Sequence, residues 1–383
     1  MRVAIIDADL IGRSKHRFPN LACMKISSFY KKEGNEVTLL QSYDDLENYD
    51  KVFISKVFTD TPVPDGITSL SWVECGGTGF YFDQAPNLPD EIEHSFPDYH
   101  LYDDFIEEQK KTRIKEYIEK EGDVSEEDIK NIVKKWDTEF KEYTDYSIGF
   151  LTRGCFRKCG FCVNKKYDRV FLHSPLEEFY DPTRKKICLL DDNFLGQPNW
   201  KECLEELIAT GKPFKFKQGL DERLLTPEKC EILFNAKYDG EITFAFDNIK
   251  DYRIIRKKLE LIRSHSSKQI KFYVLCGFDD EGKYDADFWE RDLISTFERI
   301  KLLGRYKALP YIMRFNKYEE SPYRGIYVTL ARWINQPSFF KKKSFYEFCQ
   351  IGGKSSMRYL DELERDYPVL ARQYCYTKYW GGE

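Results

Sequence analysis

The sequence predicts an α/β protein: an N-terminal Rossmann-like domain, a partial (β/α)6 TIM-like barrel and a helical C-terminal tail. Three observations support this prediction. A strand–helix–strand pattern with short links opens the chain, which is typical of a parallel βαβ unit. From residue 146 to residue 314, six apolar runs alternate with helical stretches. Polar residues follow each of those six runs, where a barrel of parallel strands carries its chemistry.

Composition excludes several classes of protein. The 383 residues are 42% hydrophobic and 33% charged, which is too apolar for a disordered chain and too long for a small disulfide scaffold. No apolar run approaches the roughly 20 residues of a membrane span, and no signal-peptide pattern opens the chain, so we expect a cytoplasmic protein. The 60 Lys and Arg against 65 Asp and Glu make nucleic acid an unexpected partner.

The Rossmann-like domain is expected over residues 1–105. Its predicted elements are a strand at 3–6, a helix at 20–32 and strands at 36–40 and 51–55. A glycine cluster, Gly76, Gly77 and Gly79, follows in its loop-rich second half. Residues 106–145 then change to dense charge, and we expect two surface helices there, forming a linker. Ser125 and Asp128 make an approximate capping box for the second of these helices.

The partial barrel is expected over residues 146–318. Its predicted strands are 146–152, 186–190, 213–218, 241–246, 270–276 and 307–314. Helices are predicted at 200–210, 227–236, 251–265 and 286–303, with one more after the cysteines at 155–162. Residues 319–383 are expected to form the helical C-terminal extension.

Three of the eleven cysteines, Cys155, Cys159 and Cys162, form a C-x3-C-x2-C motif directly after the first predicted barrel strand. Three thiolates at this spacing can converge on one metal centre. Structural zinc takes four protein ligands, and neither a second cysteine pair nor a suitably spaced histidine pair is present. The motif therefore favours a [4Fe–4S] cluster with one iron open to another ligand over zinc.

The stretch from Thr152 to Cys162 resembles the cysteine motif of the radical S-adenosylmethionine (SAM) superfamily, especially its methylthiotransferase and cobalamin-domain branches. Leu190-Asp191-Asp192-Asn193-Phe194 resembles the acidic loop that contacts the methionine amine in that superfamily. Gln218-Gly219-Leu220-Asp221-Glu222-Arg223 resembles its third-strand segment. The core resemblance covers residues 146–318.

The resemblance implies an enzyme that reductively cleaves SAM at the cluster to a 5′-deoxyadenosyl radical, which then abstracts a hydrogen from an unidentified small-molecule or peptide substrate. Asp191, Asp192 and Asn193 are then expected at the SAM amine, and Arg223 at its carboxylate. Gln218 and Asp247 are expected at the ribose or amine, and Phe161 at the adenine. The alternative for Asp192, Asn193 and Asp247 is a helix N-cap. A flavodoxin- or ferredoxin-type reductase is the implied electron donor. No catalytic residue beyond these is identified.

The first domain resembles, in strand pattern, the cobalamin-binding domain that precedes some radical SAM cores. It lacks the D-x-H-x-x-G motif, because Asp7-Ala8-Asp9-Leu10-Ile11-Gly12 contains no histidine, and we interpret Leu10 as standing where the cobalt-ligating histidine would be. Cobalamin is therefore not favoured as a cofactor, and a substrate-holding or scaffolding domain is preferred. A cobalamin-dependent radical methyltransferase and a non-catalytic metal-binding interaction module are the two alternative functions. With only Cys23 and Cys75 here, no second cluster of the methylthiotransferase kind is expected.

Overall fold

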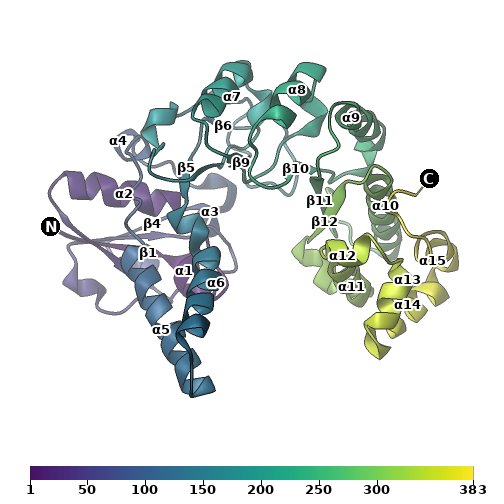
Figure 1. Cartoon of the computed structure of the whole chain (residues 1–383), viewed down its shortest axis with the longest axis horizontal. Coiled ribbons are helices and arrows are strands. Elements are labelled where there is room, and N and C mark those ends of the chain that lie inside the picture. The colour runs from purple at the N-terminus through teal and green to yellow at the C-terminus, as the bar shows by residue number, and fades with distance from the viewer. Residues whose placement is uncertain (383) are drawn as a thin grey trace. The chain divides into compact units, whose positions relative to one another are not determined.

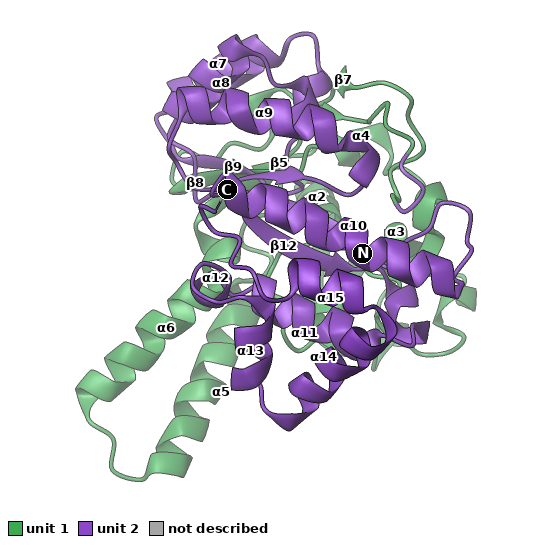
Figure 2. Ribbon diagram, turned by 90° about the vertical axis from the view of Figure 1, so that its right-hand side faces the viewer, with its two compact units in different colours: residues 1–158, 162–191 green, residues 159–161, 192–383 purple. Residues whose placement is uncertain are grey.

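The computed structural model describes residues 1–382, which divide into two compact units (Figure 2). The first unit comprises residues 1–158 and 162–191, and the second comprises residues 159–161 and 192–383. Each unit is built on parallel strands joined by helices (Figure 1), which confirms the α/β class. The domain boundaries expected from the sequence stay a prediction.

The N-terminal sheet of the first unit has four parallel strands in the order β2-β1-β3-β4. The strands are β1 (Arg2–Asp7), β2 (Glu36–Leu40), β3 (Lys51–Ser55) and β4 (Val73–Gly76). The first three strands and helix α2 (Leu21–Lys32) confirm the predicted βαβ pattern. The short strand β4 was not predicted, because only four residues after a proline-rich loop give little periodicity.

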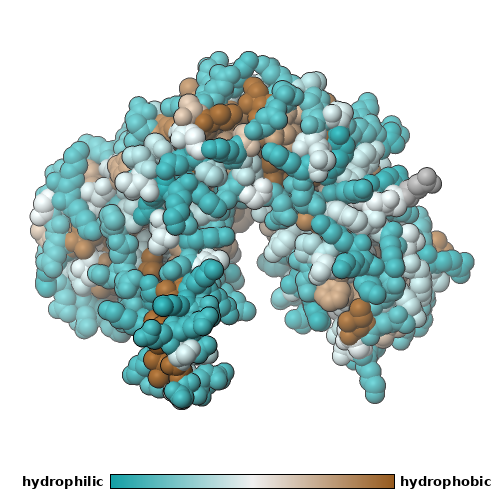
Figure 3. Space-filling view, viewed as in Figure 1, coloured by the Kyte–Doolittle hydropathy of each residue, from teal (hydrophilic) through white to brown (hydrophobic). Residues whose placement is uncertain are grey.

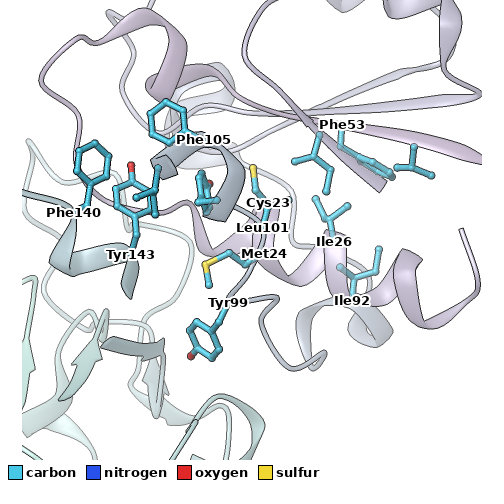
Figure 4. Packing of buried hydrophobic residues seen from close by; sticks show 14 of the residues in the cluster. Cys23, Met24, Ile26, Phe53, Ile92, Tyr99, Leu101, Phe105, Phe140 and Tyr143 are labelled. Atoms are coloured by element: carbon cyan, nitrogen blue, oxygen red, sulfur yellow. The ribbon is translucent and has the colours of Figure 1, made fainter. Parts of the chain in front are cut away.

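Helices cover both faces of this sheet because alternate residues of its strands point to opposite sides. On one face, Val3, Ile5 and Phe53 pack with buried aromatic residues of α5 (Asp103–Glu121) and α6 (Glu126–Thr144) (Figure 4). The predicted pair of charged helices is thus present, with the expected capping box at its second helix. Its base belongs to the core of this unit, so it is more than a solvated linker. Short helices α1 (Ala8–Gly12), α3 (Thr78–Tyr81) and α4 (Asp90–Glu93) complete this part.

The first unit also contains the start of the predicted barrel. Strands β5 (Tyr146–Gly149) and β8 (Lys186–Leu189) pair in parallel, as predicted for the first two barrel strands. The helix predicted after the cysteines is wrong. Residues 163–185 instead form strand β7 (Phe171–Leu172) and one 3-10 turn, η4 (Leu176–Glu178), because Pro175 and Pro182 interrupt any helical run.

The second unit contains the other four predicted strands: β9 (Phe214–Phe216), β10 (Ile242–Ala245), β11 (Ile270–Cys276) and β12 (Leu309–Arg314). Strands β10, β11 and β12 pair in parallel, and Leu220 forms a parallel bridge to Phe244. The four predicted helices are present as α7 (Trp200–Ala209), α8 (Pro227–Asn235), α9 (Tyr252–His265) and α10 (Ala286–Arg305). The curvature of the expected partial barrel stays a prediction.

The C-terminal extension is helical, as predicted. Its elements are α11 (Arg324–Ile334), α12 (Pro337–Phe340), α13 (Phe345–Ile351), α14 (Lys354–Asp366) and α15 (Pro368–Tyr374). Hydrophilic side chains cover most of the face shown in Figure 3. None of the helices within residues 1–382 is both long and apolar enough to span a membrane.

Candidate functional site

The cysteine motif lies in a loop that a short antiparallel ladder closes at its base. Strand β6 (Thr152–Arg153) leads into the loop and pairs with β7, at which the loop returns. Gly154 makes the first turn with φ +86°, and a Cβ there would lie 2.3 Å from the carbonyl oxygen of Arg169. Only glycine tolerates both the backbone angle and this close approach. The local sequence thus folds the three cysteines into a closed loop.

Backbone N–H groups donate to two of the three sulfurs. The amide of Arg157 lies 3.3 Å from Cys155 Sγ, and the amide of Asn164 lies 3.3 Å from Cys162 Sγ. Lys158 fastens the same loop, because its Nζ donates to the carbonyls of Lys165 and Tyr167 at 2.9 and 2.7 Å. Hydrogen bonds to sulfur favour the thiolate, which is the form that binds a metal.

The tip of the loop, residues 159–161, belongs to the second unit and packs there on the segment after β11. The rings of Phe161 and Phe278 meet edge to face with centroids 5.4 Å apart. A Cβ on Gly160 would lie 2.6 Å from Asp280 Oδ1 and 2.9 Å from the ring of Phe278. Phe161 therefore lies by the carboxyl end of a parallel strand, which is where the adenine contact is expected.

The acidic stretch after β8 divides into two kinds of residue. Asp191 is buried, and its carboxylate accepts from the amides of Leu151 and Thr152 and from the Thr152 hydroxyl. It therefore holds the entrance to the cysteine loop. Asn193 precedes the 3-10 helix η5 (Phe194–Gly196), but its side chain makes no capping hydrogen bond, and Asp192 is half-buried beside it. The N-cap alternative is thus not realised at Asn193, and SAM contact at these residues stays a prediction.

The segment after β9 places its charged side chains in one network. Asp221 Oδ1 accepts from Arg223 Nε at 2.7 Å, and Arg223 Nη1 donates to Asp251 Oδ2 at 2.8 Å. Two carboxylates therefore orient the guanidinium, and the pKa of Arg223 rises further because of this pairing, despite its partial burial. Within residues 1–382, Nη2 of Arg223 makes no hydrogen bond. Gln218 is exposed.

Glu222 lies in the same segment, and the sequence analysis assigned it no role. Its side chain is buried, Oε2 accepts from the amide of Ala245 at 3.3 Å, and Oε1 has no hydrogen-bond partner in the described chain. Burial, with a smaller contribution from Asp221, raises the pKa of Glu222 from 4.5 to about 8. The carboxyl group is thus largely a neutral acid at pH 7. Glu222 lies between the charged residues Asp221 and Arg223 in the sequence, so the sequence did not indicate that its side chain is buried.

Asp247 belongs to a second network, which helix α10 organises at the ends of β10 and β11. Asp247 Oδ1 accepts from the amide of Leu275 at 3.0 Å, and burial raises the pKa of Asp247. Arg299 on α10 is fully buried and donates to the carbonyls of Phe246, Asp247 and Leu275 at 2.8–3.0 Å. This arginine holds two strand ends together, so Asp247 lies in a fixed frame. It acts as a strand-end residue and not as a helix cap.

Asp292 lies seven residues before Arg299 on the same helix and holds the segment that follows β11. Its Oδ2 accepts from the amide of Gly277 at 2.9 Å and from the hydroxyl of Tyr327 at 2.6 Å. Sequence analysis missed both α10 residues, although a spacing of seven places them on one face of a helix where Phe288, Trp289 and Leu303 are also buried. Charged residues on an apolar helical face were the available signal.

A bound corrin would need backbone to approach it closely, which glycines permit, but at two of the three N-terminal glycines the chain itself occupies the space beside the backbone. A Cβ on Gly77 would lie 2.3 Å from the carbonyl oxygen of Lys56, and one on Gly79 would lie 2.8 Å from that of Phe58; Gly76 is open. In register with D-x-H-x-x-G, Asp9 and not Leu10 takes the place of the histidine. Its carboxylate accepts from the amides of Val57 and Phe58. These residues therefore do not fit a corrin well.

In the part of the chain that the structure describes, no three His, Cys, Asp or Glu side chains are arranged to hold a metal ion. Cys155 and Cys162 belong to the first unit and Cys159 to the second. The cysteines as cluster ligands, and the other assigned residues as SAM contacts, therefore stay predictions. Of these residues, Asp192 and Asn193 begin the main segment of the second unit, Gln218 and Arg223 follow β9, Asp247 follows β10, and Phe161 packs on the segment after β11.

Comparison with known proteins gave few matches. No protein-family model matches the chain, and no curated protein matches it. Two solved structures match over 97% of it, both of the cobalamin-dependent S-adenosylmethionine radical enzyme OxsB: one with aqua-cobalamin and S-adenosylmethionine bound, the other with aqua-cobalamin bound. Each is 15% identical with a TM-score of 0.34, and the match covers 56% of that protein's chain. The enzyme belongs to the superfamily that the cysteine motif resembles, and the chain spans little more than half its length.

Proposed function

We propose that the chain is a radical SAM enzyme in which Cys155, Cys159 and Cys162 hold a [4Fe–4S] cluster with one open iron. The observation that carries this proposal is the cysteine loop: three thiols within eight residues, a glycine that permits its first turn, and amide donors to two sulfurs. A set of three thiolates without a fourth protein ligand suits a cluster that binds a further ligand. When bound, such a cluster supplies the electron for reductive cleavage of SAM.

The second unit supplies the groups that would orient SAM. Asp192 and Asn193 follow β8 without a capping role for Asn193, and they suit the methionine amine. Arg223 is held by two carboxylates with Nη2 directed to neither, and it suits the methionine carboxylate. Asp247 is fixed by the amide of Leu275, and as a hydrogen-bond acceptor it suits a ribose hydroxyl. With Phe161 at the adenine and Gln218 at the ribose, each part of SAM has a partner.

Glu222 adds a proton donor to this set. A neutral carboxylic acid with one unpartnered oxygen donates a hydrogen bond, which a carboxylate cannot do. It lies beside Arg223, and its other oxygen is tied to β10 through Ala245. We assign it a positioning role for the Arg223 end of the site.

An acidic electron donor of the flavodoxin or ferredoxin type fits the positive surface of the cysteine loop. Lys158, Lys166 and Arg169 line an open cavity of about 720 Å³ there, together with Tyr167, Asp168 and Phe171. Positive residues around a redox site attract an acidic partner at long range, and this attraction weakens with salt. The rate of reduction by flavodoxin should therefore fall as ionic strength rises.

The test is anaerobic reconstitution of the full chain with iron and sulfide, followed by a reductant and SAM. About four irons and four sulfides per chain, with release of 5′-deoxyadenosine, would support the proposal. Zinc in place of iron, or a cluster without any 5′-deoxyadenosine, would contradict it and favour a non-catalytic metal-binding module. The substrate, a small molecule or a peptide, would then be sought by its dependence on the same cysteines.

A further inference from the structure

An open cavity of about 430 Å³ lies in the second unit, and its lining residues have no role in the proposed function. The start of α9, the last half of α10 and the end of α15 form its walls. Its charged and aromatic lining is Lys250, Arg253, Lys301, Arg305, Tyr252 and Tyr374. The volume falls within the range of pockets that hold small molecules.

The four basic residues face this cavity without ion-pair partners. Among residues 1–382, none of Lys250, Arg253, Lys301 or Arg305 has a carboxylate within 4.0 Å of its charged group, although the chain has 65 acidic residues. Bringing like charges together without a counter-ion costs free energy. The cavity therefore has a positive excess that suits an anion.

The one acidic residue in the lining is already engaged. Glu298 Oε1 accepts from the Tyr374 hydroxyl at 3.0 Å, and this pairing, with burial, raises the pKa of Tyr374. The Tyr374 ring stacks on Phe297 with centroids 5.6 Å apart, and Lys301 Nζ lies 5.8 Å from that ring. Glu298 thus fixes an aromatic wall and neutralises at most one of the four cations.

We propose that this cavity binds a small polyanion carrying two or more phosphate groups, such as a nucleoside diphosphate. Four cations match the charge of a di- or triphosphate, and Arg253 and Arg305 can contact phosphate oxygens in pairs. The positive end of the α9 dipole adds to the same field. The aromatic walls suit a base. A recess of this size in a chain of net charge −5 favours a small ligand over a nucleic-acid backbone.

The experiment is isothermal titration of the full chain with ADP, with tripolyphosphate and with a short DNA duplex. The expected result is saturable binding of one ADP per chain, weakened at least tenfold in the double variant Arg253→Gln/Lys301→Gln. The control, Lys342→Gln/Lys354→Gln, removes two exposed lysines of the same unit that do not line the cavity and should bind as the parent does. Binding of tripolyphosphate without binding of ADP would support the proposed phosphate contacts and contradict the proposed contact between the aromatic walls and a base.

The proposal is overturned if neither phosphate probe binds, if both variants lose binding equally, or if only DNA binds. Circular dichroism shows whether the double variant is folded. Removing two like charges should leave its thermal midpoint equal to or above that of the parent, so loss of binding cannot be ascribed to unfolding. Iron content and 5′-deoxyadenosine release should be unchanged in the double variant, so this test is independent of the proposed function.

Discussion

Buried carboxylates follow parallel strands in both units, but they are used differently. After β1, every carboxylate oxygen of Asp7 and Asp9 has a donor from the chain itself: the amides of Leu10, Val57 and Phe58 and the hydroxyls of Tyr102 and Thr61. After β9, within residues 1–382, Glu222 keeps one oxygen without a partner, and Arg223 keeps one nitrogen without a hydrogen bond. Polar residues at strand ends thus indicate a ligand site only where hydrogen-bonding capacity is left over.

The contrast between these two regions predicts that the chemistry takes place outside the N-terminal sheet. Removal of single cysteines should have the largest effect of the changes tested here. Replacing Cys155, Cys159 or Cys162 by Ala should abolish the cluster, because each supplies one ligand and none has a neighbouring substitute. Cys75→Ala, at a similarly half-exposed cysteine of the N-terminal sheet, is the matched control and should retain full iron. Iron analysis and the brown absorption report the result. Full iron in any of the three loop variants would refute the ligand assignment.

The second test compares the buried acids directly. The pKa of Glu222 is raised to about 8 by burial, so the folded chain holds a proton that the unfolded chain releases above pH 4.5. The free energy of unfolding should therefore fall as pH rises from about 4.5 to about 8, by at most about 5 kcal/mol from this group. Glu222→Gln should remove that slope and unfold later than the parent at pH 8. Urea melts at pH 5 and pH 8 measure both.

Asp7→Asn makes the same change at a buried acid whose two carboxylate oxygens both accept hydrogen bonds. The pKa of Asp7 is also raised, to about 7, so its stabilising contribution also falls with rising pH, here from about pH 4 to pH 7. Its oxygens, however, accept from Leu10 and Tyr102, and an amide NH2 would meet one of these donors. Asp7→Asn should therefore cost about 1–3 kcal/mol at pH 5, where Glu222→Gln costs little. Equal costs would remove the distinction between the two regions.

A smaller effect is expected for SAM affinity. Asp192→Ala or Asn193→Ala should weaken SAM binding by about 1.5–3 kcal/mol, roughly ten- to hundredfold, while the cluster remains intact. Equilibrium binding to the reconstituted protein measures this loss. Asp9→Ala, in helix α1 of the first unit, should leave affinity unchanged. An unaltered affinity with a lowered thermal midpoint would show that Asp192 and Asn193 serve only the fold.

The smallest expected signal is that of cobalamin. Because Lys56 and Phe58 approach Gly77 and Gly79, and Asp9 takes the histidine's place, hydroxocobalamin should produce no saturable spectral change. The protein should also be isolated without corrin absorbance. Binding of one cobalamin per chain with a shifted visible spectrum would show that the N-terminal sheet does bind a cofactor. It would also favour radical methyl transfer as the reaction.

Much of this organisation was readable from the sequence because it depends on local patterns. Strands β1, β2 and β3, the helices from α7 to α10 and the capping box at Ser125 follow from periodicity and cap chemistry over a few residues. The choice of Cys155, Cys159 and Cys162 as candidate ligands depends only on their C-x3-C-x2-C spacing. Gln218, predicted at the end of strand 213–218, lies two residues past the shorter β9, and Arg223 lies further on, in the 3-10 helix η6 (Glu222–Leu224).

What the sequence did not reveal depends on contacts between distant residues. The SAM contact of Asp191 stays a prediction, but no local pattern indicated that its carboxylate accepts from Leu151 and Thr152, some forty residues earlier. Arg299 reaches carbonyls more than twenty residues away, and Glu222 is buried by strands that no local pattern identifies as its neighbours. Packing between distant residues decides which polar side chains form hydrogen bonds within the protein. The spacing of residues in the sequence therefore cannot distinguish a ligand contact from a structural hydrogen bond.

Electron paramagnetic resonance of the reduced, reconstituted chain tests the central claim most directly. The proposal predicts the signal of a one-electron-reduced [4Fe–4S] cluster that shifts on addition of SAM, because SAM binds the iron without a cysteine ligand. The shift should be weaker at equal SAM concentration in Asn193→Ala. A reduced cluster whose signal is identical with and without saturating SAM would contradict an open iron, and with it the assignment of this chain as a radical SAM enzyme.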